Sequence, residues 1–325
     1  MKRNTTPALA VVGAMLLGVS MPAADARQLA GPVNHGAFGA APTPMLQPPA
    51  DPTAPAADAK ATARRNVQTL RVPSKRLDKE IPINLLLPKG YATSARRYPV
   101  LYLLHGSYGG YKDWNDSTGV AAYVAELPLI VVMPDANGNS RYINSPGLGR
   151  YQDFFLTELV PYIDANYRTL GAREGRALAG LSMGGYGAWR IALDAPGTFA
   201  AAASLSGSFN WGEGDFDAEQ VKQRAVPLYG GDGPEQRKLY AADRILLHID
   251  KNIKNGMYVG PALRFDIGTD DNLVTANRRT RDQLGERKVP FEYAEYPGAH
   301  TWTYWDAHLR DALPFLLRHL RQPAR

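Results

Sequence analysis

The 325-residue chain contains no cysteine, and this absence removes several kinds of chemistry at once. Disulfide frameworks, cysteine nucleophiles, cysteine-ligated zinc and iron–sulfur clusters are all excluded. Zinc-binding and phosphate-binding signatures are also lacking, so we expect neither a metal nor an organic cofactor. The formal net charge of +6 is spread along the chain without a nucleic-acid recognition motif, which predicts a basic surface and no nucleic-acid partner.

The N-terminal region has an apolar run that is too short for a comfortable membrane span. This run, residues 8–19, follows Lys2 and Arg3 and precedes a small-residue segment at 24–26. The arrangement is typical of a secretory signal peptide over residues 1–26, cleaved near Ala26, and an uncleaved anchor is the alternative. We therefore expect a periplasmic or secreted protein without stable membrane insertion. The sequence indicates no oligomeric state.

Two further segments differ in composition. Residues 27–62 are rich in alanine and proline and have few large apolar side chains, which predicts an extended tether. Residues 63–322 alternate apolar runs with helical patterns, which predicts an α/β fold whose mostly parallel central sheet is flanked by helices. The expected strands cover residues 67–72, 81–87, 99–104, 129–133, 176–179, 200–205, 262–267 and 291–296, and the expected helices include 154–162, 186–193 and 306–320.

A candidate nucleophile follows the fifth of these strands. Ser182 lies in the sequence Gly-Leu-Ser-Met-Gly, which matches the G-x-S-x-G pattern of a sharp strand-to-helix turn. Side chains at the two flanking positions, 180 and 184, would collide with neighbouring backbone, and glycine avoids that collision. A plain glycine-rich turn is the alternative, but the preceding strand and the following small-residue helix favour the nucleophile.

The base and the acid should follow later strands in chain order. His300 lies in the loop after the last expected strand, where its imidazole can reach over the end of the sheet toward Ser182. Asp270 and Asp271 both follow the strand before it, and only one of them can face the histidine. The other aspartate is expected to cap the next helix.

Cleavage of an ester places negative charge on the carbonyl oxygen, which two backbone N–H groups usually hold. The first donor should be the residue after the nucleophile, Met183. The second should come from the glycine-rich loop 105–110, and Ser107 is the preferred position. A simple turn is the alternative interpretation of this loop.

Taken together, these motifs resemble one family. The chain is similar to the esterase D-like branch of the α/β-hydrolases, which includes S-formylglutathione hydrolases, feruloyl esterase domains, tributyrin-type esterases and mycolyltransferases. The resemblance runs from about residue 66 to residue 320, and it implies an α/β-hydrolase fold with the acid at Asp271 and the second oxyanion donor at Ser107. The matching stretches are residues 98–106, 113–114, 132–135, 158–164, 179–188, 268–273 and 298–300.

The substrate pocket is less well defined by the sequence. Residues 208–260 replace a simple connection between strands and are expected to form a cap, with a helix around 239–253. The aromatic side chains that could line the pocket are Trp114, Phe209, Trp211 and Trp302. The alternative is that these rings belong to the core.

The combined prediction is an exported serine esterase that forms an acyl-enzyme and needs no cofactor. Its expected substrates are small-molecule or carbohydrate esters with short acyl, acetyl or feruloyl groups. One alternative is an acyltransferase of the mycolyltransferase type, which passes the acyl group to an alcohol instead of water. The other is a non-catalytic module that binds glycan or protein, against which the complete Ser182, His300 and Asp271 set argues.

Overall fold

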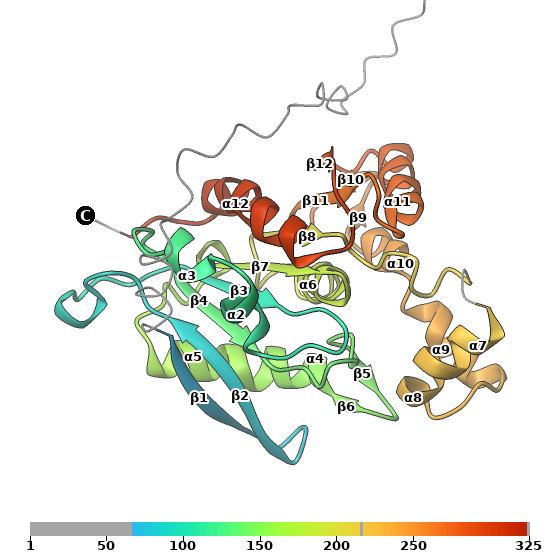
Figure 1. Ribbon diagram of the computed structural model, residues 1–325, viewed down its shortest axis with the longest axis horizontal. Coiled ribbons are helices and arrows are strands. Elements are labelled where there is room, and N and C mark those ends of the chain that lie inside the picture. Colours follow the sequence, from blue (N-terminus) through green and yellow to red (C-terminus); the bar gives the residue numbers. More distant parts are fainter. Residues whose placement is uncertain (1–66, 215–216, 324–325) are drawn as a thin grey trace, which may run out of the picture. The chain divides into compact units, whose positions relative to one another are not determined.

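The computed structural model describes residues 67–214 and 217–323, so the predicted signal peptide and tether lie outside the described residues. Within these described residues, the main sheet has eight strands in the order β1-β2-β4-β3-β7-β8-β11-β12 (Figure 1). β2 runs antiparallel to both of its neighbours, and the remaining pairs are parallel. The strands are β1 (Gln68–Ser74), β2 (Lys79–Leu86), β3 (Val100–Leu104), β4 (Ile130–Pro134), β7 (Arg176–Leu181), β8 (Ala201–Leu205), β11 (Ala262–Gly268) and β12 (Phe291–Tyr296). These are the eight strands that the apolar runs predict.

Helices cover both faces of the sheet because the central strands are apolar on both sides. In β3, Val100, Tyr102 and Leu104 belong to one core cluster, whereas Leu101 and Leu103 belong to another. Successive side chains of a strand point to opposite faces, so each cluster marks one face. The first cluster includes α5 (Val160–Asn166) and α6 (Met183–Asp194), and the second includes α2 (Asp113–Ser117), α3 (Val120–Tyr123) and α12 (Trp302–His319).

The segment between β8 and β11 is an insertion of short elements, as the sequence predicts for residues 208–260. The expected single helix over 239–253 is wrong, because the chain forms two helices that are separated at Asp243 and Arg244. Arg244 has an extended ψ of 126°, which ends the first helix and restarts the second. The elements are α7 (Ala218–Gln220), the π-helical η4 (Val221–Ala225), α8 (Val226–Tyr229), α9 (Pro234–Ala242), α10 (Ile245–Asp250), β9 (Ile253–Lys254) and β10 (Met257–Tyr258).

The remaining elements connect the sheet and pack around it. They are the 3-10 helices η1 (Tyr91–Thr93) and η3 (Arg173–Gly175), the small strands β5 (Asn144–Ser145) and β6 (Gly149–Arg150), α4 (Tyr151–Asp153), the π-helical η2 (Phe154–Leu159) and α11 (Val274–Glu286). Among the described residues, we find no helix with both the length and the apolar character needed to cross a membrane.

Candidate active site

Ser182 lies at a strained turn between β7 and α6. Its backbone has φ 52° and ψ −118°, a combination that a residue with a side chain rarely adopts and that is typical of functional sites. The neighbouring glycines make this turn possible. A Cβ atom on Gly180 would lie 2.4 Å from the carbonyl oxygen of Gly184, and one on Gly184 would lie 2.4 Å from the carbonyl oxygen of Leu104. The predicted collision with backbone is therefore present at both positions.

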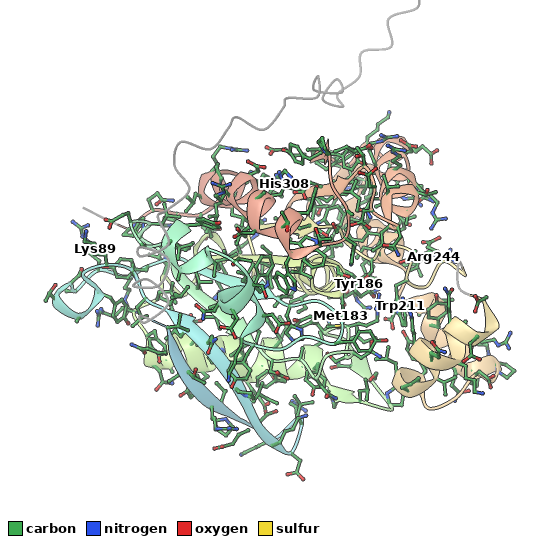
Figure 2. The ribbon with its side chains drawn as sticks, viewed as in Figure 1. Lys89, Met183, Tyr186, Trp211, Arg244 and His308 are labelled. Atoms are coloured by element: carbon green, nitrogen blue, oxygen red, sulfur yellow. The ribbon has the colours of Figure 1, made fainter. Side chains whose placement is uncertain are left out.

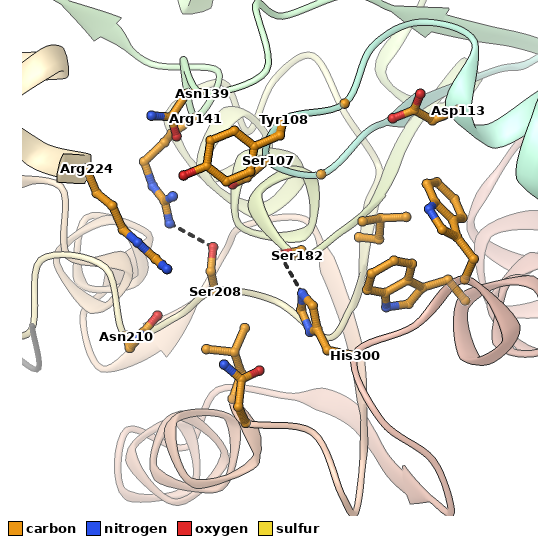
Figure 3. Close-up of a pocket in the computed structure, with 17 residues that line it drawn as sticks. Ser107, Tyr108, Asp113, Asn139, Arg141, Ser182, Ser208, Asn210, Arg224 and His300 are labelled. Atoms are coloured by element: carbon orange, nitrogen blue, oxygen red, sulfur yellow. Dashed lines mark hydrogen bonds between the residues drawn. The ribbon is translucent and has the colours of Figure 1, made fainter. Parts of the chain in front are cut away.

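His300 and Asp271 complete a continuous chain of hydrogen bonds that begins at this serine. The Nε2 atom of His300 lies 2.9 Å from Oγ of Ser182, and its Nδ1 atom lies 2.8 Å from Oδ2 of Asp271 (Figure 3 shows the first contact). A carboxylate can only accept, so Nδ1 carries the proton and Nε2 is the acceptor for the serine hydroxyl. This is the tautomer that a general base needs.

The two candidate aspartates have different surroundings. Asp271 is only 2% exposed, and its Oδ1 atom accepts a hydrogen bond from the Leu273 N–H at 2.8 Å, which fixes the carboxylate toward His300. Asp270 is exposed, and its backbone N–H donates to the carbonyl oxygen of Gly298. The contact with the histidine therefore belongs to Asp271. Each of the three side chains follows a different strand, β7, β11 or β12, at the carboxyl end of the sheet.

The loop after β3 packs directly against the serine turn. A Cβ atom on Gly106 would lie 2.5 Å from a methyl carbon of Leu181, so a larger residue would displace the Leu181 side chain. Ser107 follows it and lines the same cavity as Ser182. Met183 is the first residue of α6, and N–H groups in the first turn of a helix have no partner within the helix. Of the two residues expected to provide the oxyanion donors, Met183 thus directly follows the nucleophile and Ser107 lines the same cavity.

A buried histidine holds this loop in place. The Nε2 atom of His105 accepts a hydrogen bond from the Ala136 N–H at 2.9 Å, and its Nδ1 atom lies 2.8 Å from the carbonyl oxygen of Gly106. Burial lowers the pKa of His105, which keeps the ring neutral and able to accept. The imidazole therefore ties the loop after β3 to the loop after β4.

A cavity of about 420 Å³ opens beside the serine and histidine. Trp302 and Trp305, from the start of α12, line it, and the ring of Trp305 packs edge-to-face on His300 with centroids 4.9 Å apart. Polar residues contribute much of the remaining wall. They are Ser107, Asp113, Asn139, Arg141, Ser208, Asn210, Arg224 and Asn272.

Three of the four aromatic residues expected in the pocket lie in the core instead. Phe209 packs against Trp189 and Phe265 at centroid distances of 4.8 and 5.7 Å, and Trp211 packs edge-to-face on Tyr240. Figure 2 labels Trp211 beside Tyr186. The indole Nε1 of Trp114 donates to the carbonyl oxygen of Leu104, so this side chain supports the end of β3 from behind.

Sequence reasoning missed several pocket residues. Arg141, Ser208, Asn210 and Arg224 line the cavity but belong to no motif that we recognised. Arg141 follows the polar turn after β4, at the carboxyl edge of the sheet, and this position is the signal that could have indicated it. Tyr108 is a further exposed liner, with 81% of its surface accessible.

The strand order, the strained serine turn and the Ser–His–Asp hydrogen bonds define the α/β-hydrolase class. Residues 74–316 match the family model described as "Putative esterase", and the chain belongs to this Esterase family.

Relatives agree with this assignment. The chain is 33% identical over 242 residues to Esterase Rv1288 of Mycobacterium tuberculosis, a match that covers 68% of this chain and 52% of that protein. The chain thus spans about half the length of this esterase. It is 26% identical over 291 residues to the diacylglycerol acyltransferase/mycolyltransferase Ag85A of the same species, covering 78% of this chain and 81% of the relative. The solved structure of a ferulic acid esterase superposes with a TM-score of 0.68 and 28% identity, covering 78% of this chain and 98% of that one.

Proposed function

We propose that the chain is an exported serine esterase that hydrolyses carboxylic esters through an acyl-enzyme. The observation that carries the proposal is the hydrogen-bonded series from Ser182 through His300 to Asp271, with distances of 2.9 and 2.8 Å. Such a series activates a serine hydroxyl that is otherwise a weak nucleophile.

The reaction consists of two half-reactions. His300 accepts the Ser182 proton as Oγ attacks the ester carbonyl, and the N–H groups of Met183 and Ser107 stabilise the oxyanion. The alcohol then leaves with the proton from His300. Water, deprotonated by His300, attacks the acyl-enzyme and releases the acid. Asp271 keeps the imidazole oriented and stabilises its positive charge throughout.

The substrates that we propose are esters of short acyl, acetyl or feruloyl groups, including esters of carbohydrates. Relatives named as an acetyl esterase and a ferulic acid esterase support this range. Trp302 and Trp305 offer aromatic surface beside the histidine for an aryl group.

The test is hydrolysis of p-nitrophenyl acetate, butyrate and octanoate and of methyl ferulate. Ser182→Ala should lower kcat by at least ~10³-fold on whichever ester is turned over. Ser117→Ala is the matched control, because Ser117 is an exposed serine on α2, and it should retain full activity. Activity that survives Ser182→Ala in a folded protein would contradict the nucleophile assignment.

The second candidate function is acyl transfer, which the similarity to the Ag85A acyltransferase favours. Both reactions share the acyl-enzyme and differ in the molecule that attacks it. Adding glucose as an acceptor and analysing the products by mass spectrometry separates them, because an acylated sugar forms only if the alcohol competes with water.

Export from the cytoplasm rests on the predicted signal peptide over residues 1–26. N-terminal sequencing of protein recovered from the periplasm or the medium of a bacterial host should give a chain that begins near Arg27. A chain that starts at Met1 and stays in the cytoplasm would contradict the proposal.

A further inference from the structure

Arg141 is a buried cation in the wall of the active-site cavity. The side chain is only 4% exposed, and its Nη2 atom donates to Oγ of Ser208 at 2.8 Å. The guanidinium lies 3.6 Å from the centroid of the Trp211 ring. Its Nε atom has no hydrogen-bond partner among the described residues, and no described carboxylate forms an ion pair with the guanidinium. A buried charge without a counter-charge is costly unless a ligand supplies one.

A second arginine adds to the positive charge of this wall. Arg224, from η4, is exposed and lines the same cavity, and its like charge disfavours the charged form of Arg141. Figure 3 shows the side chains of Arg141 and Arg224 approaching Ser208 from different elements. Burial lowers the pKa of Arg141 to about 10, with a smaller contribution from Arg224, so the group remains charged at neutral pH.

The backbone that presents Arg141 is itself unusual. Arg141 and Tyr142 have φ values of 54° and 58°, so two consecutive residues with side chains adopt the left-handed conformation. Such strain persists only where the surrounding structure imposes it. The Tyr142 hydroxyl donates to the carbonyl oxygen of His105, which anchors the turn to the loop beside the nucleophile.

We propose that this wall is an anion subsite, formed by Arg141, Arg224 and Ser208, which binds a carboxylate carried by the ester substrate. The inference rests on the proposed esterase function and names its substrate class. Ser208 connects the subsite to the nucleophile, because its N–H donates to the carbonyl oxygen of Ser182 at 3.1 Å. Arg141, Arg224 and Ser208 line the same cavity as Ser182, so one ester molecule can place its carbonyl at the serine and its carboxylate at this wall. Guanidinium groups are well suited to it, because their paired donors match the two oxygens of a carboxylate.

A carboxylate bound in this cavity can belong to either half of the ester. The acyl half would carry it in a monoester of a dicarboxylic acid, and the alcohol half would carry it in an ester of a hydroxy acid. We compare ethyl succinate, the singly charged monoester, with ethyl succinamate for the first case. For the second case, we compare 2-acetoxyacetate with 2-acetoxyacetamide. Each pair differs only in the charge of one terminal group, and acid release measured by pH-stat reports both.

The expected result is a preference of about tenfold in kcat/KM for the charged member of one pair, because a hydrogen bond to a charged group is roughly twice as strong as one to a neutral group. Arg141→Gln should reduce the ratio toward one, and Arg141→Lys should preserve part of it. Arg224→Gln is the second variant, because the exposed Arg224 can be replaced with less risk to folding than the buried Arg141. Arg237→Gln, which removes an exposed arginine of α9 that does not line this cavity, should leave the ratio unchanged.

A binding measurement keeps this inference separate from the esterase proposal. Millimolar succinate should raise the Tm of the wild type by at least about 2 °C, whereas succinamide should not, and Arg224→Gln should lose the effect. Hydrolysis of both amide esters without any charge preference, or the absence of stabilisation by succinate, would overturn the anion subsite. Stabilisation by succinate without hydrolysis of any ester would support the subsite and contradict the esterase.

Discussion

Replacing Asp271 by asparagine tests the central geometry with very little change of shape. The Asp271 side chain is fully enclosed and lies 2.8 Å from Nδ1 of His300, so it determines which ring nitrogen carries the proton. An asparagine amide can donate to Nδ1, which moves the proton to Nε2 and prevents His300 from accepting the Ser182 proton. A loss of about 10⁴ in kcat is expected from a wrong tautomer, which is about 5.4 kcal/mol of barrier at 1.36 kcal/mol per decade.

The assay is kcat on the best p-nitrophenyl ester at neutral pH, with Tm measured in parallel. Asp270→Asn is the matched control, since the neighbouring aspartate is exposed and is not seen to contact the histidine. We expect this variant to stay within about twofold of the wild type, because surface substitutions away from special features have small effects. If folded Asp271→Asn kept more than about a tenth of the wild-type kcat, or if Asp270→Asn were the more damaging change, the reasoning would be refuted.

Three further predictions concern the serine turn, a buried ion pair and the oxyanion loop. Gly184→Ala should lower Tm and abolish turnover, because its Cβ would lie 2.4 Å from a backbone oxygen. Gly285→Ala in α11, where the space around the glycine is open, is the control and should have a Tm equal to or slightly above that of the wild type, both measured by differential scanning calorimetry. Although burial alone would raise it, hydrogen bonds from His248 and Arg190 hold the pKa of Asp194 well below its usual range. Because the pKa is depressed in the folded protein, the ionised carboxylate stabilises the fold above about pH 4, and this stabilisation is lost as the pH falls further. Asp194→Asn should therefore lower the free energy of unfolding, measured by urea titration, by about 3 kcal/mol at pH 7 and by less near pH 3. Ser107→Ala should retain kcat within about threefold, because the proposed donor is the backbone N–H and not the hydroxyl, and a larger loss would assign a role to the side chain.

The sheet and the three reactive residues could be predicted from the sequence because their signals are local. Continuous apolar runs identify strands that are buried on both faces, and the glycines at 180 and 184 identify the turn around Ser182. His300 follows from chain order and from its position after the last strand. The choice between Asp270 and Asp271 came from family resemblance, because spacing alone leaves both possible.

The pocket wall could not be predicted in the same way because it depends on contacts between distant segments. Trp211 and Trp302 have the same side chain, yet one is enclosed by Tyr240 and its neighbours while the other lines the cavity. Arg141 and Ser208 are 67 positions apart and meet only after the sheet has formed. No local pattern distinguishes an arginine that faces a buried cavity from one that faces water.

His300 follows β12, the strand at one edge of the sheet. In the part of the chain that the structure describes, β12 pairs with β11 alone and its residues are at most partly buried, whereas β7 and β3, which lead to Ser182 and to the loop beside it, are fully buried. Elements with few buried contacts open at lower free energy than the core. Detachment of this edge would carry His300 away from Ser182 while the rest of the sheet stayed intact. Turnover is therefore more sensitive to local opening of this C-terminal edge than to unfolding of the whole domain. As the denaturant concentration rises, enzyme activity should fall before the fluorescence of the buried tryptophans changes.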